Sequence, residues 1–117
     1  MKDYKKTFIK VDDDIKTSIE IIHKSGLRIG LVVGENSKLE GTVTDGDIRR
    51  ALLKKIDMSE NVQKIMNQKP TFSSKNATSE EKINIMKDRD ILHIPIVDES
   101  NKIIGLETMQ NFVKNKN

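Results

Sequence analysis

Apolar and polar positions along the chain repeat themselves at a fixed offset. LRIGLVVGENSKLEGTVT (27–44) aligns without a gap with ILHIPIVDESNKIIGLET (91–108). The same register places Ile19 on Ile83 and Thr7 on Thr71. One ungapped offset over this span indicates a tandem duplication, with the two repeats predicted at residues 1–60 and 61–117.

Each repeat predicts the same order of elements. A short extended entry leads into a helix with one apolar face, which Ile15, Ile19 and Ile22 form in the first repeat. An apolar strand, a polar turn, a second strand and a closing helix follow. In the first repeat the predicted strands are residues 7–11, 29–33 and 39–43, with the turn at 34–38. In the second repeat the predicted strands are residues 70–73, 93–97 and 103–107, with the turn at 98–102. The order β-α-β-β-α, given twice, predicts an α+β fold of two repeats related by a pseudo-twofold axis.

Polar residues mark where these helices begin and end. Residues 12–14, all aspartates, are expected to cap the first helix, and Gly26 is expected to end it. Thr78 and Glu81 form a capping box for its counterpart. The closing helix of the first repeat is predicted to bury Ile48, Ala51 and Leu52, and Ser59 is predicted to cap a short helical stretch within the connection at residues 57–66.

Composition limits the classes of function. The formal net charge is +3, but lysines are scattered between acidic residues. With three Phe and one Tyr, the chain has few aromatic side chains on which nucleic-acid bases could stack. This pattern argues against nucleic-acid binding. No apolar run approaches a membrane span, and no secretory signal begins the chain, so we expect a cytoplasmic protein. Without cysteine, and with His23 and His93 far apart in the sequence, we expect neither a metal site nor a nucleophile, and no catalysis by this chain.

The segment GTVTDGD (41–47) joins a strand to a helix and allows two interpretations. Thr44 and Asp47 have the spacing of a capping box, with Asp45 as an alternative N-cap and Gly46 as a turn residue. Alternatively, the segment holds a polar ligand, since a carboxylate matches the two hydroxyls of a cis-diol and amides at a helix start favour an anion. The two interpretations are compatible, and the residues alone leave both open.

The duplication, the strand IPIV (94–97) and the ending GTVTDGD together resemble a tandem pair of cystathionine-β-synthase (CBS) domains, the Bateman module. TVTDGDIRRALL is most similar to the pairs attached to sugar-phosphate nucleotidyltransferases, and pairs at the end of sugar-phosphate isomerases are similar as well. The resemblance implies a regulatory, non-catalytic homodimer that needs no cofactor and binds an adenine nucleotide or another adenosyl ligand between its halves. It implies that Thr44 contacts a phosphate and that Asp47 accepts from the ribose hydroxyls. The phosphate charge would be met by Arg28, Arg49 or Arg50.

The resemblance also names the remaining candidate ligand contacts, which are Asp45, Ile29 and Gly30 in the first repeat and Thr108, Asn111, His93 and Pro95 in the second. Asn111 replaces the family's Asp, which predicts one occupied site rather than two. His93 has a second interpretation, as a strand-end histidine satisfied by backbone. The resemblance implies that the pair modulates a linked sugar-phosphate nucleotidyltransferase, or alternatively that it is a regulatory segment of a sugar-phosphate isomerase. A further alternative is a structural dimerisation module that binds nothing, a role favoured by Asn111 and by Leu31 at the position that matches Pro95.

Overall fold

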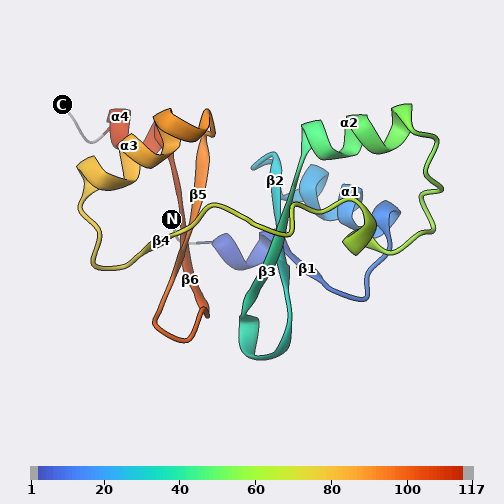
Figure 1. Ribbon diagram of the computed structural model, residues 1–117, viewed down its shortest axis with the longest axis horizontal. Coiled ribbons are helices and arrows are strands. Elements are labelled where there is room, and N and C mark those ends of the chain that lie inside the picture. The colour runs from blue at the N-terminus through green and yellow to red at the C-terminus, as the bar shows by residue number, and fades with distance from the viewer. Residues whose placement is uncertain (1–2, 115–117) are drawn as a thin grey trace. The chain divides into compact units, whose positions relative to one another are not determined.

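The computed structural model describes residues 3–114, apart from the side chains of residues 113 and 114, and its contacts divide into two compact units. The N-terminal unit is Asp3–Pro70, and the C-terminal unit begins at Thr71 (Figure 1). Each contains a three-stranded sheet and helices in the order β-α-β-β-α, so the predicted α+β class is confirmed. The pseudo-twofold relation and the repeat boundary after residue 60 stay predictions, and residues 115–117 of the second repeat lie outside the described range.

The sheet of the N-terminal unit has the strand order β1-β2-β3. Strand β1 (Phe8–Lys10) pairs in parallel with β2 (Ile29–Val33), and β2 pairs antiparallel with β3 (Leu39–Thr44). The predicted bounds of β2 are confirmed, and β3 is one residue longer than predicted. Thr7, predicted as the first extended residue, instead ends a 3-10 helix, η1 (Tyr4–Thr7). A second 3-10 helix, η2 (Glu35–Ser37), forms the turn between β2 and β3.

Helices α1 (Ile15–Ser25) and α2 (Asp45–Leu53) lie on one face of this sheet (Figure 1). Asp14 caps α1, because its Oδ1 accepts from the Thr17 N–H at 2.8 Å. Hydrogen bonds from the Thr17 hydroxyl and N–H lower the pKa of Asp14, so this contribution to stability is present above the usual pKa and is lost as pH falls through the lowered one. Gly26 ends α1 at φ 71°, as predicted.

The core of the N-terminal unit lies between the sheet and the helices. It consists of five buried residues: Ile9, Ile22, Val32, Val43 and Val62. Helix α2 adds Ala51, which is 2% exposed, and the half-buried Ile48. The prediction that Leu52 is buried is wrong, since its side chain is 58% exposed. Leu52 lies about 100° around the helix from Ala51 and so points away from the sheet.

The connection after α2 packs back onto the start of α1. The carbonyls of Glu60 and Met58 accept from the N–H groups of Ile15 and Lys16, both at 2.9 Å, and so satisfy helix-start amides that have no partner within α1. These bonds extend the N-terminal unit past the predicted repeat boundary. The short helix here, η3 (Val62–Lys64), is capped by Asn61, so the prediction of Ser59 as its cap is wrong. The N–H and hydroxyl of Ser59 instead donate to Asp57, which lowers the pKa of that carboxyl.

Residues that follow η3 add a short edge to the sheet. Asn67 and Thr42 exchange two backbone hydrogen bonds, at 2.8 and 3.2 Å, in an antiparallel bridge. Gly41 permits this approach, because a Cβ there would lie 2.7 Å from Met66 Sδ and 2.8 Å from the Asn67 carbonyl oxygen. The connection is therefore held against β3 two residues before its last residue, Thr44.

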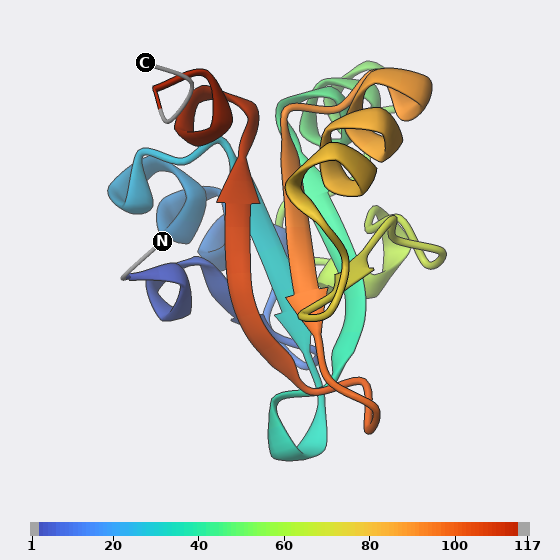
Figure 2. The same ribbon diagram turned by 90° about the vertical axis from the view of Figure 1, so that its left-hand side faces the viewer.

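The C-terminal unit repeats the plan with a shorter first strand. Strand β4 (Ser73–Ser74) pairs in parallel with β5 (His93–Val97), and β5 forms an antiparallel hairpin with β6 (Ile103–Thr108), drawn in orange and red in Figure 2. The helices are α3 (Ser79–Arg89), which Thr78 caps as predicted, and α4 (Met109–Lys114). Met86, Ile94 and Ile96 form the buried core. Among the helices described in either unit, none has the length and apolar character that crossing a membrane requires.

A partly buried ion pair distinguishes the second repeat from the first. Lys82 Nζ, on α3, lies 3.1 Å from Glu107 Oε1, on β6, and the two side chains are 10% and 30% exposed. The matching positions of the first repeat hold Ser18, which bonds to the Ile15 carbonyl oxygen, and the apolar Val43. Glu107 Oε2 is buried and has no hydrogen-bond partner among the described residues. The second repeat thus joins helix to sheet with charge where the first uses apolar packing.

We predict that Gly41→Ala lowers the free energy of unfolding by roughly 1–3 kcal/mol, because the new methyl group overlaps a backbone oxygen that cannot move without breaking the Thr42–Asn67 bridge. Gly105→Ala is the matched control at the equivalent position, where a Cβ would meet Ile96 at an ordinary 3.8 Å. Chemical denaturation of both variants measures the difference. Equal effects of the two substitutions would contradict the role given to Gly41.

Candidate ligand-binding site

The candidate residues of the first repeat gather where β3 passes into α2. Ile29 and Thr44 are directly paired across the β2–β3 ladder, so their side chains share one face of the sheet. That face is opposite to the one covered by α1 and α2. Gly30 pairs with Val43 on the helix-covered face, and the space of its missing Cβ is filled by Ile9. A ligand on the opposite face could contact Gly30 only through its backbone groups.

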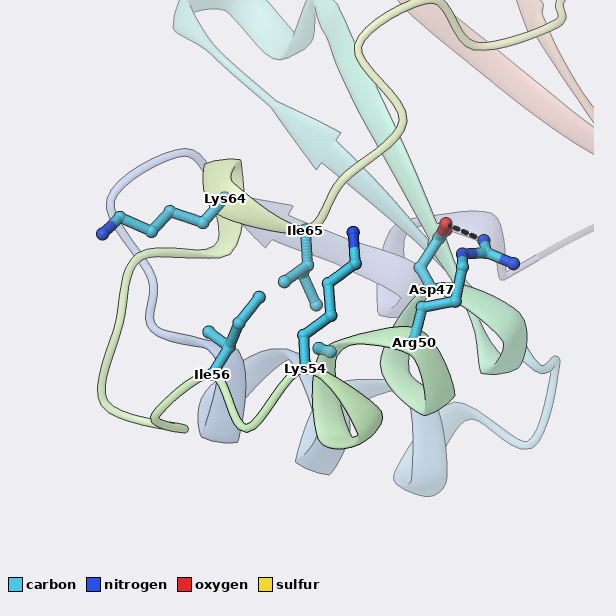
Figure 3. Close-up of a pocket in the computed structure, with 7 residues that line it drawn as sticks. Asp47, Arg50, Lys54, Ile56, Lys64 and Ile65 are labelled. Carbon is cyan, nitrogen blue, oxygen red and sulfur yellow. Dashed lines mark hydrogen bonds and ion pairs between the residues drawn. The ribbon is translucent and has the colours of Figure 1, made fainter.

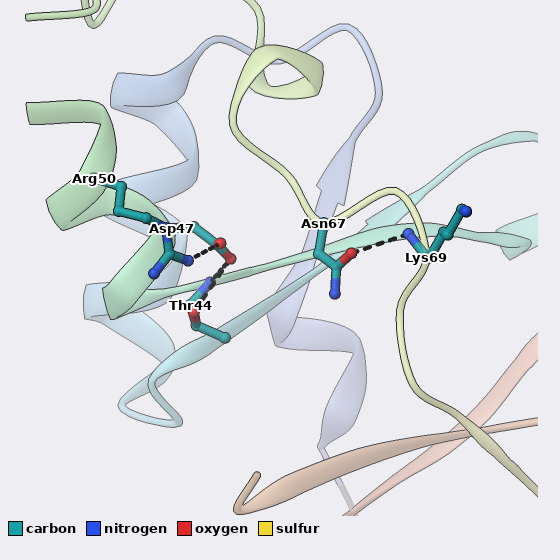
Figure 4. Close-up of polar contacts among 5 residues, drawn as sticks. All are labelled: Thr44, Asp47, Arg50, Asn67 and Lys69. Carbon is teal, nitrogen blue, oxygen red and sulfur yellow. Dashed lines mark hydrogen bonds and ion pairs between the residues drawn. The ribbon is translucent and has the colours of Figure 1, made fainter. Parts of the chain in front are cut away.

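Asp47 connects the end of the strand to the first turn of the helix. Its Oδ2 accepts from the Thr44 N–H at 2.9 Å and from the Thr44 hydroxyl at 3.2 Å (Figure 4). Thr44 is the N-cap of α2, so the interpretation of Thr44 and Asp47 as a capping pair is confirmed. The alternative that Asp45 is the N-cap is wrong, because Asp45 is already the first residue of the helix and is exposed.

Arg50 binds the other oxygen of the same carboxylate. Its Nη2 lies 2.6 Å from Asp47 Oδ1, and the two side chains are 63% and 13% exposed. The guanidinium reaches back along the helix and passes over Gly46, where a Cβ would lie 3.4 Å from Nη1. Of the three arginines that the sequence offered for a phosphate, the structure places Arg50 at Asp47 (Figure 4).

Asn67 is a further polar side chain near this point, which sequence reasoning missed. It pairs with Thr42, so it projects from the same face of the sheet as Thr42 and Thr44. Its Oδ1 accepts from the Lys69 N–H at 3.0 Å, and the amide lies between Thr44 and Lys69 in Figure 4. The one sequence signal for this contact was Gly41, a glycine inside a strand, which often marks a close backbone approach.

A small hollow adjoins Asp47 between α2 and the connection that follows it. It has a volume of about 90 Å³, and Figure 3 shows its lining, which is Asp47, Arg50, Ala51, Lys54, Ile56, Lys64 and Ile65. Pockets for drug-sized ligands have volumes of about 300–1,000 Å³, so this hollow is too small to enclose a nucleoside. Lys64 points away from it and pairs with Glu60 at 3.0 Å (Figure 3).

The second repeat pairs its candidate residues in the same register as the first, but with different side chains. His93 is paired with Thr108 across the β5–β6 ladder, and Pro95 is paired with Leu106. Thr108 Oγ1 accepts from the backbone N–H of Asn111 at 3.2 Å. In the first repeat the Thr44 hydroxyl also donates to the Asp47 carboxylate, and the residue equivalent to Asp47 in the second repeat is the uncharged Asn111. The two equivalent positions therefore differ in charge.

This arrangement can recognise a ligand with adjacent hydroxyl groups. A carboxylate held at a fixed position accepts two hydroxyl hydrogen bonds, and such charge-assisted bonds are stronger than neutral ones. The Thr44 hydroxyl has to rotate away from Asp47 before it can donate to a phosphate oxygen.

Comparison with known proteins gives a consistent family. The CBS domain family model matches residues 2–54 and again residues 62–114. Protein RP505 of Rickettsia prowazekii is 36% identical over 95 residues, which cover 81% of this chain. Arabinose 5-phosphate isomerase of Francisella tularensis is 28% identical over 91% of the chain, and inosine-5′-monophosphate dehydrogenase of Aquifex aeolicus is 32% identical over 92%. The chain spans 29%, 32% and 22% of the lengths of these relatives.

Solved structures of CBS proteins share the fold. The CBS domain pair of protein MJ0100, solved with 5′-methylthioadenosine and S-adenosyl-L-methionine, has a TM-score of 0.83 at 20% identity and covers 94% of this chain and 90% of its own. The CBS domain protein PAE2072 of Pyrobaculum aerophilum, solved with AMP, has a TM-score of 0.81 at 15% identity, with coverages of 89% and 80%. Two family matches, one in each repeat, agree with two β-α-β-β-α units, and the chain belongs to the CBS domain family as a tandem CBS domain pair.

Proposed function

We propose that this CBS pair is a regulatory module that binds an adenosyl nucleotide at Thr44 and Asp47 and adjusts the activity of a linked enzyme. The observation that carries the proposal is the Asp47 carboxylate, which is held beside Thr44 and next to the Arg50 guanidinium. A ribose diol would bind the carboxylate, and a phosphate would lie toward Thr44. Ile29, across the ladder from Thr44, would contact the apolar part of the ligand.

Two CBS proteins of the same fold support the class of ligand. One was solved with AMP, and the other with 5′-methylthioadenosine and S-adenosyl-L-methionine. Asp45 is exposed at the helix start, and as a second negative charge it would oppose a phosphate there. In the second repeat, Thr108, Asn111, His93 and Pro95 stay proposed contacts of a weaker site, because Asn111 offers one acceptor and no charge. One bound ligand per chain is the expected stoichiometry.

The linked enzyme is proposed to act on a sugar phosphate. The match to an arabinose 5-phosphate isomerase supports the isomerase alternative, and the nucleotidyltransferase stays a prediction from the resemblance of TVTDGDIRRALL. A ligand regulates such an enzyme only to the extent that it binds one conformation of the module more tightly than another.

A structural dimerisation module is the second candidate function. It is favoured by Leu52 and Leu53, two neighbouring leucines on α2 that are 58% and 76% exposed. Closed twofold association is the commonest arrangement of soluble oligomers and would cover such side chains.

We expect sedimentation velocity to give twice the chain mass without ligand, and a monomer mass would contradict the proposed homodimer.

Calorimetric titration with AMP, ADP, ATP and S-adenosylmethionine tests the regulatory proposal. We expect micromolar binding of at least one of these ligands, and loss of that binding in Asp47→Ala. A ligand present at a hundred times its dissociation constant should also stabilise the fold by about 2.7 kcal/mol, which a thermal melt detects.

Because Asp47 also caps α2, its replacement is expected to lower stability by about 1 kcal/mol whether or not a ligand binds. Asp14→Ala is the matched control, since it removes a capping carboxylate from the other helix of the same unit. The control should destabilise the fold and leave ligand binding intact. No heat from any ligand with the wild-type chain would reduce Asp47 to a helix cap and favour the structural module.

A further inference from the structure

The Asp47 carboxylate has too few unoccupied acceptor positions for a diol. A carboxylate offers about four such positions, and the Thr44 N–H, the Thr44 hydroxyl and the Arg50 guanidinium already use three of them. A ribose diol brings two donors, so at least one internal donor has to leave when the ligand binds. The site is therefore occupied by the protein's own groups before any ligand arrives.

Arg50 is the donor that is most easily displaced. It contacts Asp47 from the end of a long side chain that is 63% exposed, and exposed ion pairs are weakly held. The Thr44 N–H, in contrast, is fixed by the backbone at the end of β3 and is needed to begin α2. The Thr44 hydroxyl can rotate toward a phosphate, but it bonds to Oδ2, so its rotation frees a position on the capping oxygen and leaves Oδ1 with Arg50. Displacement of Arg50 frees Oδ1 and leaves the capping bond to Oδ2 in place.

The displaced guanidinium stays close to the proposed phosphate position. Arg50 lies one helical turn from Asp47 and folds back over Gly46 toward Thr44. Its planar fork of donors matches a phosphate better than an ammonium group does. Arg50 thus exchanges one negatively charged partner, Asp47, for another, the ligand, provided that the ligand is an anion near this point.

We propose that Arg50 makes this site selective for adenosyl ligands that carry a phosphate, by exchanging its partner from Asp47 to the phosphate when the ribose takes Asp47. This inference rests on the proposed function. An uncharged adenosyl ligand whose ribose takes Oδ1 separates Arg50 from Asp47 and gives Arg50 no new partner. A sulfonium ligand would in addition place a second cation beside Arg50. Lys54, which lines the adjoining hollow, adds a further positive charge near this point.

Calorimetric titration of wild-type chain and Arg50→Gln with AMP and with 5′-methylthioadenosine tests the exchange. We expect the wild type to prefer AMP. Arg50→Gln should weaken AMP binding about tenfold, the loss typical of a hydrogen bond to a charged group. The same variant should bind 5′-methylthioadenosine at least as tightly as the wild type, because Asp47 no longer has to release a cation.

Arg49→Gln is the matched control, since it removes the same charge from the neighbouring, exposed residue of α2. It should change neither affinity by more than about twofold, as expected for an exposed charge that solvent and salt screen. A thermal melt of each variant verifies that the chain remains folded.

Four results would overturn the inference. Equal weakening of both ligands by Arg50→Gln would show a general role in folding the site. Equal weakening of AMP binding by Arg49→Gln and Arg50→Gln would show only an overall charge effect. A wild-type chain that binds 5′-methylthioadenosine as tightly as AMP would remove the selectivity while the proposed function stands. Binding of neither of these ligands, nor of ADP, ATP or S-adenosylmethionine, would overturn the proposed function, and this inference with it.

Discussion

The hydrogen bond from the Thr44 N–H to the Asp47 carboxylate joins the sheet of the N-terminal unit to its closing helix. It fixes the residue at which β3 ends and α2 begins, and so it sets which face of α2 meets the sheet. Ala51 and Ile48 reach the core as a result, and Arg50 lies on the side of the helix from which it can contact Asp47. Fold and candidate site thus depend on the same carboxylate.

Capping and ligand binding make compatible demands on that carboxylate. Capping needs one oxygen to face the backbone, and the second oxygen is then directed outward. In the absence of ligand the outward oxygen is neutralised by Arg50, which avoids a partly buried carboxylate without a counter-charge. Under the proposed function, the capping pair Thr44 and Asp47 would also form a ligand site whose charge is balanced both before and after binding.

Most of the fold could be predicted because its signals are local. The duplication, the apolar strands and the caps at Asp14, Gly26 and Thr78 each depend on residues close together in the sequence, and each was confirmed. Residues of equivalent position even share a conformation, since Asp90 takes the left-handed helix-end conformation that Gly26 takes in the first repeat.

What sequence reasoning missed depends on contacts between distant segments. The pairing of Asn67 with Thr42 and the bonds from the connection to the start of α1 join residues 25 or more positions apart. Ser59 was a reasonable cap by type, but the short helix begins at Val62 and Asn61 caps it. The choice of Arg50 over Arg28 and Arg49 likewise needed the direction in which a side chain folds, and residue spacing does not give this direction.

The central claim is that one carboxylate caps α2 and receives the ligand. A nuclear magnetic resonance titration with AMP tests it most directly, if it follows the Thr44 backbone amide and the Arg50 side-chain Nε–H signal in a nitrogen-15-labelled chain. The account predicts that both signals shift with the same dissociation constant, with Arg50 changing its partner and the Thr44 amide remaining protected from solvent exchange. Saturable shifts elsewhere in the chain, with both of these signals unmoved, would contradict it.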